Sequence, residues 1–283
     1  LTGTGNAYTI TVGDSSLTAV ALNTVDAATT VAVTATAVTT ITGAASAVNT
    51  ALSASGINGL GEEFVTLTGS TSVADANTVS GKTTGAVTAT ITEGDVSTLK
   101  TLNETTNAYT LVITDTTVAV ADLETLDGLT TVAVNASNVA TLTGSISAVT
   151  DIYAANTAGT ISGLGNEAVT ISDTTSVAVA SLNTLDGKTT GTINASTIQS
   201  LTGTAADLNT AYASGGISGL GNEAVTISDT SLAVATLNTL DGNTSGAVNA
   251  STVTTLTGAA AAMNTAYASN GITGLANEAI TLD

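Results

Sequence analysis

The chain contains the stretch Gly219-Leu220-Gly221-Asn222-Glu223-Ala224-Val225-Thr226-Ile227-Ser228-Asp229, and nearly the same letters run from Gly163 to Asp173. A third copy, Gly274-Leu275-Ala276-Asn277-Glu278-Ala279-Ile280-Thr281, stands close to the C-terminus. The starting positions of the copies give a period of about 55 residues. Such a period is typical of a chain that stacks one supersecondary unit, because the unit can bury its apolar face only against its neighbours.

A turn of the type Leu185-Asp186-Gly187 recurs and divides the chain into about five units. The unit near residues 55–107 is degenerate, since Leu99-Lys100-Thr101-Leu102 stands where the other units have Leu-Thr-Gly. We expect residues 1–283 to form one continuous solenoid. Neither end has a polar terminal repeat, so we also expect this solenoid to be part of a longer array.

The composition excludes several classes of protein. The net charge of −19, with three Lys and no Arg, repels phosphate backbones and argues against nucleic-acid binding. No apolar run is long enough for a membrane span. Hydrophobic residues make up 43% of the chain but aromatic residues only 2%. This balance suits a narrow core of Ala, Val, Ile, Leu and Thr between closely stacked coils.

Two kinds of segment alternate within a unit. Apolar residues alternate with Thr, Ser and Asn in a period of two, which predicts strands at residues 167–172, 191–196, 223–228 and 246–251. After each Leu-Thr-Gly the period changes to i, i+3, i+4, which predicts helices at residues 145–155, 204–214 and 259–269. Thr204 and Asp207 have the spacing of a capping pair. Residues 176–186 fit either a helix or, in their first half, a strand.

The predicted fold is therefore a parallel β-solenoid with short helices, that is, an α/β solenoid of about 55 residues per unit. Strands stack about 4.8 Å apart and helices about 8 to 10 Å apart. Two strand layers per unit therefore advance along the axis by about the spacing of two packed helices, so each unit can carry one helix on a face. We expect the helical pattern to bury four side chains against the sheet: Leu208, Tyr212, Met263 and Tyr267.

Three sets of polar residues recur at fixed positions. Asn135, Asn194 and Asn249 predict a stacked amide ladder, with N-glycosylation at Asn-Ala-Ser as the alternative. Two acidic columns must be well solvated or bind cations, because like charges in register repel. Carboxylates suit Ca²⁺, so the candidate calcium ligands are Asp127, Asp186, Asp241, Glu167, Glu223 and Glu278.

Catalysis is not expected. The chain has no His, Cys or Arg, so the common nucleophile, base and oxyanion sets are missing, and we predict no catalytic residue and no cofactor. The recurring Tyr153, Tyr212 and Tyr267 suit a core position, with stacking on surface glycans as the alternative. Strand edges at both ends predict self-association into fibres, or pairing with neighbouring repeats of the same chain.

Two blocks carry a resemblance to known proteins: Leu201-Thr202-Gly203-Thr204-Ala205-Ala206-Asp207-Leu208-Asn209 and Asn238-Thr239-Leu240-Asp241-Gly242-Asn243-Thr244. They resemble the repeat arrays of giant secreted or cell-surface proteins of marine cyanobacteria and other aquatic bacteria, and also the repeats of cyanophage tail fibres. The resemblance implies an extracellular or cell-surface structural role, as a matrix filament or adhesin stalk. A phage tail-fibre shaft is the alternative. Ice or surface binding is a weaker one, since no Thr-x-Thr column recurs throughout.

Overall fold

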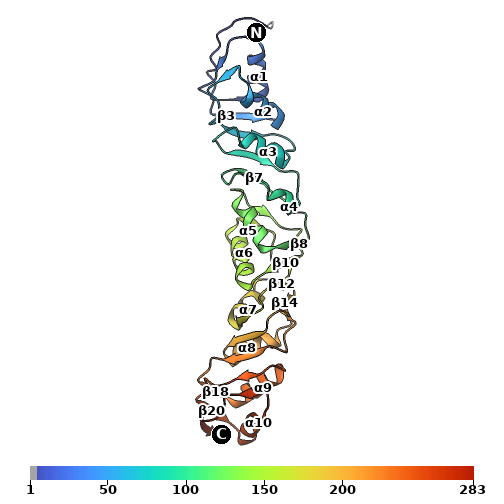
Figure 1. Ribbon diagram of the computed structural model, residues 1–283, viewed down its shortest axis with the longest axis vertical. Helices are drawn as coiled ribbons and strands as arrows, with labels where there is room; N and C mark the ends of the chain where they lie inside the picture. The colour runs from blue at the N-terminus through green and yellow to red at the C-terminus, as the bar shows by residue number, and fades with distance from the viewer. Residues whose placement is uncertain (1–4) are drawn as a thin grey trace. The chain divides into compact units, whose positions relative to one another are not determined.

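The computed structural model describes residues 5–283 and contains two compact units, which are described in turn. Unit 1 comprises the described residues up to Asp115, together with residues 122–138 and 155–163. Unit 2 comprises residues 116–121, 139–154 and 164–283. Both units repeat one motif, in which short parallel strands alternate with short helices (Figure 1).

The first half of the chain holds these elements: β1 Ser16–Thr18, α1 Ala19–Ala27, β2 Val33–Thr34, β3 Thr40–Gly43, α2 Ala45–Ser53, β4 Ile57–Asn58, β5 Phe64–Leu67, α3 Val73–Ser80, β6 Val87–Thr90, α4 Val96–Leu99, β7 Ala108–Thr110, β8 Thr117–Ala119, α5 Val120–Gly128, β9 Val134–Asn135 and β10 Thr141–Gly144. In unit 1, β1-β3-β5-β6-β7 form one sheet, and β2 with β4 and β9 with β11 (Ile161–Ser162) form smaller ones.

The second half continues with α6 Ile146–Ala158, β12 Ala168–Ile171, β13 Ser176–Ala178, α7 Val179–Asp186, β14 Ile193–Asn194, β15 Ser200–Gly203, α8 Ala205–Ala213, β16 Ile217–Ser218, β17 Ala224–Ile227, β18 Ser231–Ala233, α9 Val234–Asn243, β19 Val248–Asn249, β20 Thr255–Gly258, α10 Ala260–Ala268, β21 Ile272–Thr273 and β22 Ala279–Leu282. The sheets of unit 2 are β8-β10-β12-β14-β16, β13-β15-β17-β19-β21 and β18-β20-β22.

The register of the second of these sheets, β13-β15-β17-β19-β21, shows how the chain winds. It returns to the neighbouring strand after about 24 residues, always in the parallel sense. One row of facing residues is buried throughout and forms a continuous apolar stripe: Val177, Leu201, Val225, Val248 and Ile272. Because side chains alternate along a strand, their neighbours face the other side of the sheet.

A short step interrupts this winding at regular places. Strand β17 ends at Ile227, and β18 begins at Ser231 and starts a new sheet. Strand β12 is followed in the same way by β13, which is the first strand of the sheet β13-β15-β17-β19-β21. Two turns and one short step therefore separate the equivalent strands β13 and β18. The two spacings are different quantities: the residues that face each other are about 24 apart, whereas identical sequence recurs only after both turns and the step.

The strands and helices expected from periodicity are confirmed. The four predicted strands are β12, β14, β17 and β19, and the pairs β12–β14 and β17–β19 are parallel. The three predicted helices are α6, α8 and α10. Residues 176–186 combine both alternatives, since β13 leads directly into α7. Thr204 caps α8 as expected: its Oγ1 accepts from the Asp207 N–H at 3.1 Å and donates to the Asp207 carboxylate at 2.8 Å.

The Leu-Thr-Gly blocks form strands that the sequence did not predict, namely β3, β10, β15 and β20. Each is too short to show an alternating pattern. The closing glycine is required by a close approach. Gly203 has φ +153°, and a Cβ there would lie 2.6 Å from a methyl group of Val179. The glycine thus lets the start of α7 lie directly beside β15, the strand that contains Gly203.

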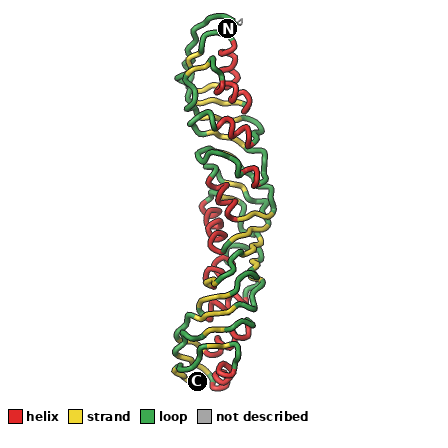
Figure 2. Tube along the Cα trace, in the orientation of Figure 1, coloured by secondary structure: helices red, strands yellow, loops and turns green. Residues whose placement is uncertain are grey.

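Helices pack beside one another on one side of the strands, as α1 and α2 do in unit 1 (Figure 2). In unit 2, α7, α8, α9 and α10 each contact the next helix. Asparagine side chains fasten these contacts by donating to a backbone carbonyl of the next helix. The donors are Asn183 to Asp207, Asn209 to Thr236 and Asn238 to Ala262, at 3.0 to 3.1 Å.

Threonine hydroxyls form an incomplete row on the outward face of the strands. In unit 1 the facing residues Thr18, Thr42, Thr66 and Thr88 share this row, which then continues with Ala108. In unit 2 the row Thr202 and Thr226 continues with Asn249. The row is therefore interrupted by other residue types in both units.

Candidate functional site

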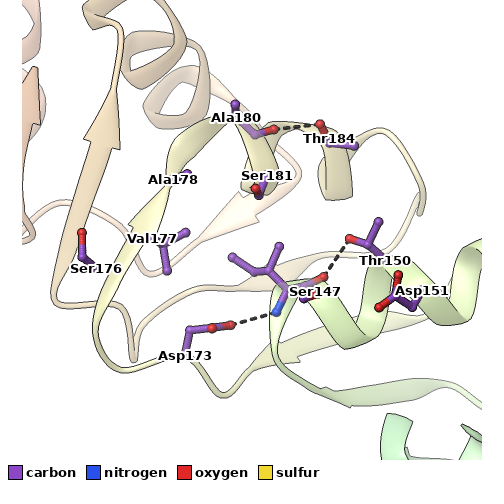
Figure 3. Close-up of a pocket in the computed structure, with 11 residues that line it drawn as sticks. Ser147, Thr150, Asp151, Asp173, Ser176, Val177, Ala178, Ala180, Ser181 and Thr184 are labelled. Carbon is purple, nitrogen blue, oxygen red and sulfur yellow. Dashed lines mark hydrogen bonds between the residues drawn. The ribbon is translucent and has the colours of Figure 1, made fainter. Parts of the chain in front are cut away.

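A groove of about 490 Å³ opens on the surface of unit 2 between α6 and α7 (Figure 3). Helix α6 contributes Ser147, Thr150 and Asp151, and the turn before β13 contributes Asp173. The opposite wall comes from β13 and α7 and includes Val177 and Ser181. The groove is lined by hydroxyl groups, two carboxylates and small apolar side chains.

One residue of the groove differs from its counterpart in the next unit. Thr150 occupies the position in α6 that Asn209 occupies in α8, as the alignment of the two helical patterns shows. Asn209 reaches the next helix and donates to the Thr236 carbonyl. Thr150 is shorter, and its hydroxyl instead turns back to the Ile146 carbonyl at 2.7 Å (Figure 3). The bridge that fastens α8 to α9 is thus replaced at this position by a bond within α6.

Several polar groups of the groove are already engaged within the protein. The Asp173 carboxylate accepts the Ile146 N–H at 2.8 Å and caps the N-terminus of α6. Thr184 donates to the Ala180 carbonyl. The lining also includes the Asp151 carboxylate and the hydroxyl groups of Ser147, Ser176 and Ser181.

Two of the three glutamates of the column are buried, contrary to the solvated face or calcium site expected from the sequence. Glu167 and Glu223 are each only 1% exposed. The Glu167 carboxylate accepts the Gly165 N–H at 2.8 and 3.1 Å and the Tyr153 hydroxyl at 3.1 Å. Glu223 repeats this arrangement with Gly221 and Tyr212. Repulsion within the column is weak because its members are two strand layers apart, about 10 Å, and each has its own donors.

The tyrosines of these pairs keep their protons at neutral pH. Burial raises the pKa of the Tyr153 hydroxyl to about 12, and the charge of Glu167 adds to the effect. Burial also raises the pKa of Tyr212, again helped by its glutamate. The third pair, Tyr267 with Glu278, has the same hydrogen bond at 2.8 Å but lies at the surface. Both tyrosines of the buried pairs therefore act as permanent hydrogen-bond donors.

The aspartate column joins successive turns instead of gathering around a common centre. Asp186 accepts the Ser214 hydroxyl at 2.7 Å, and Asp241 accepts the Ser269 hydroxyl at 2.7 Å. Asp127 accepts the Thr160 hydroxyl at 3.0 Å. Each aspartate lies in the last turn of one helix and accepts from a hydroxyl that follows the next helix.

A further acidic set was missed in the sequence. Asp229 accepts the Ala205 N–H at 2.7 Å, as Asp173 does for α6, so each aspartate caps a helix that precedes it by one turn. A negative charge is stabilising at this end of a helix. The recurrence of Ser-Asp at residues 172–173 and 228–229 was the available signal, but each capped N–H lies more than 20 residues away in the sequence.

The six candidate calcium ligands are therefore not brought together. Within residues 5–283 no group of three or more His, Cys, Asp or Glu side chains could hold a metal ion. We expect EDTA to leave the melting temperature unchanged, because these carboxylates are held by hydroxyl, phenol and backbone donors. Thermal unfolding with EDTA, and with CaCl₂ added back as the control, checks this. A fall of many degrees that Ca²⁺ reverses would contradict it.

The predicted asparagine ladder is wrong. The residues that face Asn194 on the adjacent strands are Thr170 and Ser218, not another asparagine. The Asn194 side-chain oxygen instead accepts the Ser196 N–H at 3.1 Å, closing a local turn. Asn135 and Asn249 make the same bond to Ser137 and Ser251. These asparagines therefore shape a corner of each turn.

The four expected core residues differ in burial. Leu208 is fully buried and Met263 is 4% exposed. Tyr212 is half-buried, and Tyr267 is 44% exposed. The helix phase is the same in both copies. The Tyr212 hydroxyl is additionally covered by Thr244.

No family model matches the chain, and neither a curated protein nor a solved structure matches it. Within residues 5–283, every helix is too short or too polar to cross a membrane.

Proposed function

We propose that the chain is a length of parallel α/β solenoid with a structural, extracellular role, in a cell-surface or matrix filament or an adhesin stalk. The observation that carries the proposal is the parallel register between segments about 24 residues apart, from β1 to β7 in unit 1 and from β8 to β22 in unit 2. A repeating unit of about 55 residues would hold two such turns and one short step.

The use of charge supports the same role. Most repeated carboxylates are engaged within the protein, as helix caps, links between turns or buried acceptors. A surface built for ionic recognition would leave its charges free. The resemblance to secreted repeat arrays, carried by residues 201–209 and 238–244, adds support for a place outside the cell.

A phage tail-fibre shaft is the alternative, and oligomeric state separates the two. A fibre shaft is normally an intertwined trimer, whereas all strand pairs described in residues 5–283 join segments of one chain. Self-association end to end belongs to the proposal. Such a contact would use the apolar side chains of Ile280 and Leu282 in β22, which are 49% and 57% exposed.

Electron microscopy with mass measurement in solution tests the proposal. We expect rods whose length grows by about 10 Å per unit, with the mass of one chain at low concentration and end-to-end fibres at high concentration. Ile280→Lys should suppress the fibres, and Val20→Lys, at a site 61% exposed on α1, is the matched control. Compact particles would reject the solenoid, and a stable trimer would favour the phage shaft.

A further inference from the structure

The only phenylalanine of the chain lies at the surface. Phe64 is 61% exposed on the outward face of β5. The strand register identifies its counterparts. Phe64 faces Thr40, as Ala168 faces Thr141 and Ala224 faces Ser200. The fold therefore accepts alanine at this position, so the aromatic ring is not needed for packing.

A second deviation lies two residues away. Glu62 stands where the other units have Asn166 and Asn222, and its exposed carboxylate has no partner among residues 5–283. The neighbouring Glu63 is buried like Glu167 and accepts the Gly61 N–H at 2.8 Å. The backbone bond of this turn is thus kept, although Leu52 stands where the other units have the tyrosine that donates to the buried glutamate.

Both deviations line one cavity. Its volume is about 360 Å³, within the size range of small-molecule pockets. Leu60 and the buried Val38 contribute apolar surface to this cavity, and Thr36 and Thr39 contribute hydroxyl groups. The Thr39 hydroxyl donates its hydrogen to the Ser15 carbonyl at 3.0 Å. Its oxygen can therefore only accept a hydrogen bond from a ligand.

The lining defines the ligand by its chemistry. An anionic ligand is disfavoured by Glu62 and by the net charge of −19. A wholly apolar ligand would leave the carboxylate and the hydroxyls unmatched. A small cation would gain little from an exposed aromatic ring or from an exposed carboxylate. A pyranose ring has an apolar face for the phenyl ring and several hydroxyl donors for the acceptors.

We propose that Phe64 and Glu62 form a binding site for a neutral sugar residue of a glycan. The Phe64 ring stacks on the apolar face of the sugar, while Glu62 and Thr39 accept hydrogen bonds from its hydroxyl groups. Only the unit that carries this aromatic–carboxylate pair binds. The site goes beyond the proposed structural role and does not depend on it. Sugar binding can be tested separately from the shape and the mass of the protein.

The single phenylalanine gives a selective probe. Protein grown with 4-fluorophenylalanine carries one ¹⁹F resonance, at Phe64. We expect a saturable shift on titration with cellobiose or N,N′-diacetylchitobiose, with a dissociation constant on the order of 1 mM. The affinity should be insensitive to added salt, because the ligand is neutral. Tetralysine serves as the cationic probe.

Two variants separate recognition from folding. Phe64→Ala and Glu62→Asn install the residues that the fold holds at Ala224 and Asn222, so both proteins should fold. Each should weaken binding of the same disaccharide by at least about tenfold, measured by saturation transfer to the sugar. The double variant Asn222→Glu with Ala224→Phe should create a second site of similar affinity.

The outcomes decide the proposal. A saturable disaccharide shift, together with binding that both single variants weaken by at least about tenfold in saturation transfer, supports it. It is overturned by a shift with tetralysine alone, by an affinity unchanged in Phe64→Ala, or by no shift with either disaccharide. None of these results alters the expected mass or rod shape of the protein, so the test is independent of the structural role.

Discussion

Replacing Leu208 with alanine is expected to lower the free energy of unfolding by about 2 to 4 kcal/mol. The Leu208 side chain is fully buried between α8 and the strands, and its removal leaves a cavity that the stacked turns cannot close. Native-state hydrogen exchange of the amides in α8 and β17 measures the loss, since a repeat protein can open locally.

Thr210→Ala in the same helix is the matched control. Thr210 is exposed, and its hydroxyl donates to the Ala206 carbonyl of the same helix. Alanine is the better helix former, so we expect a change within about 0.5 kcal/mol. Equal losses in the two variants would mean that the helix does not face the core as described.

Replacing Glu167 with leucine is expected to lower the free energy of unfolding by about 2 to 5 kcal/mol. The substitution leaves the Gly165 N–H and the Tyr153 hydroxyl buried without their acceptor, and each unsatisfied group costs about 1 to 3 kcal/mol. Chemical denaturation, together with hydrogen exchange at Gly165, measures the effect.

The chain supplies its own control for this substitution. Glu278 makes the same hydrogen bonds to Ala276 and Tyr267, but that pair lies at the surface. Water can replace the lost acceptor there, so Glu278→Leu should cost within about 1 kcal/mol. If both variants lost the same stability, burial would not be the reason that Glu167 matters.

The elements of the fold could be predicted where a sequence pattern was long enough to show its period. Val225 and Ile227 alternate with Thr226 and Ser228, and Leu208, Ala211 and Tyr212 follow the helical spacing. Strand β15 could not be found in this way, because Leu201-Thr202-Gly203 is too short. The sequence also gives no separate signal for the short step from β17 to β18. The residues between Ile227 and Ser231 continue the repeated sequence block without a break in pattern.

The polar residues could not be placed because spatial and sequence periods differ. The predicted ladder assumed that Asn135, Asn194 and Asn249 are neighbours, but strands meet at about 24 residues, so a chemically different residue lies between them. Burial of Glu167 was equally hidden. A carboxylate beside a glycine turn suggests an exposed position, and only the donors Gly165 and Tyr153 make its burial stable.

The winding of the chain also bears on how it folds. Parallel sheets usually need long crossovers, and such non-local pairing slows folding. Here a strand meets its partner about 24 residues away in a chain of 283, a relative contact order of roughly 0.08, which is the range of helical bundles. The entropy lost in closing each loop is set by that short separation. Adding a turn therefore carries the same closure penalty wherever it occurs, however many turns the chain already has.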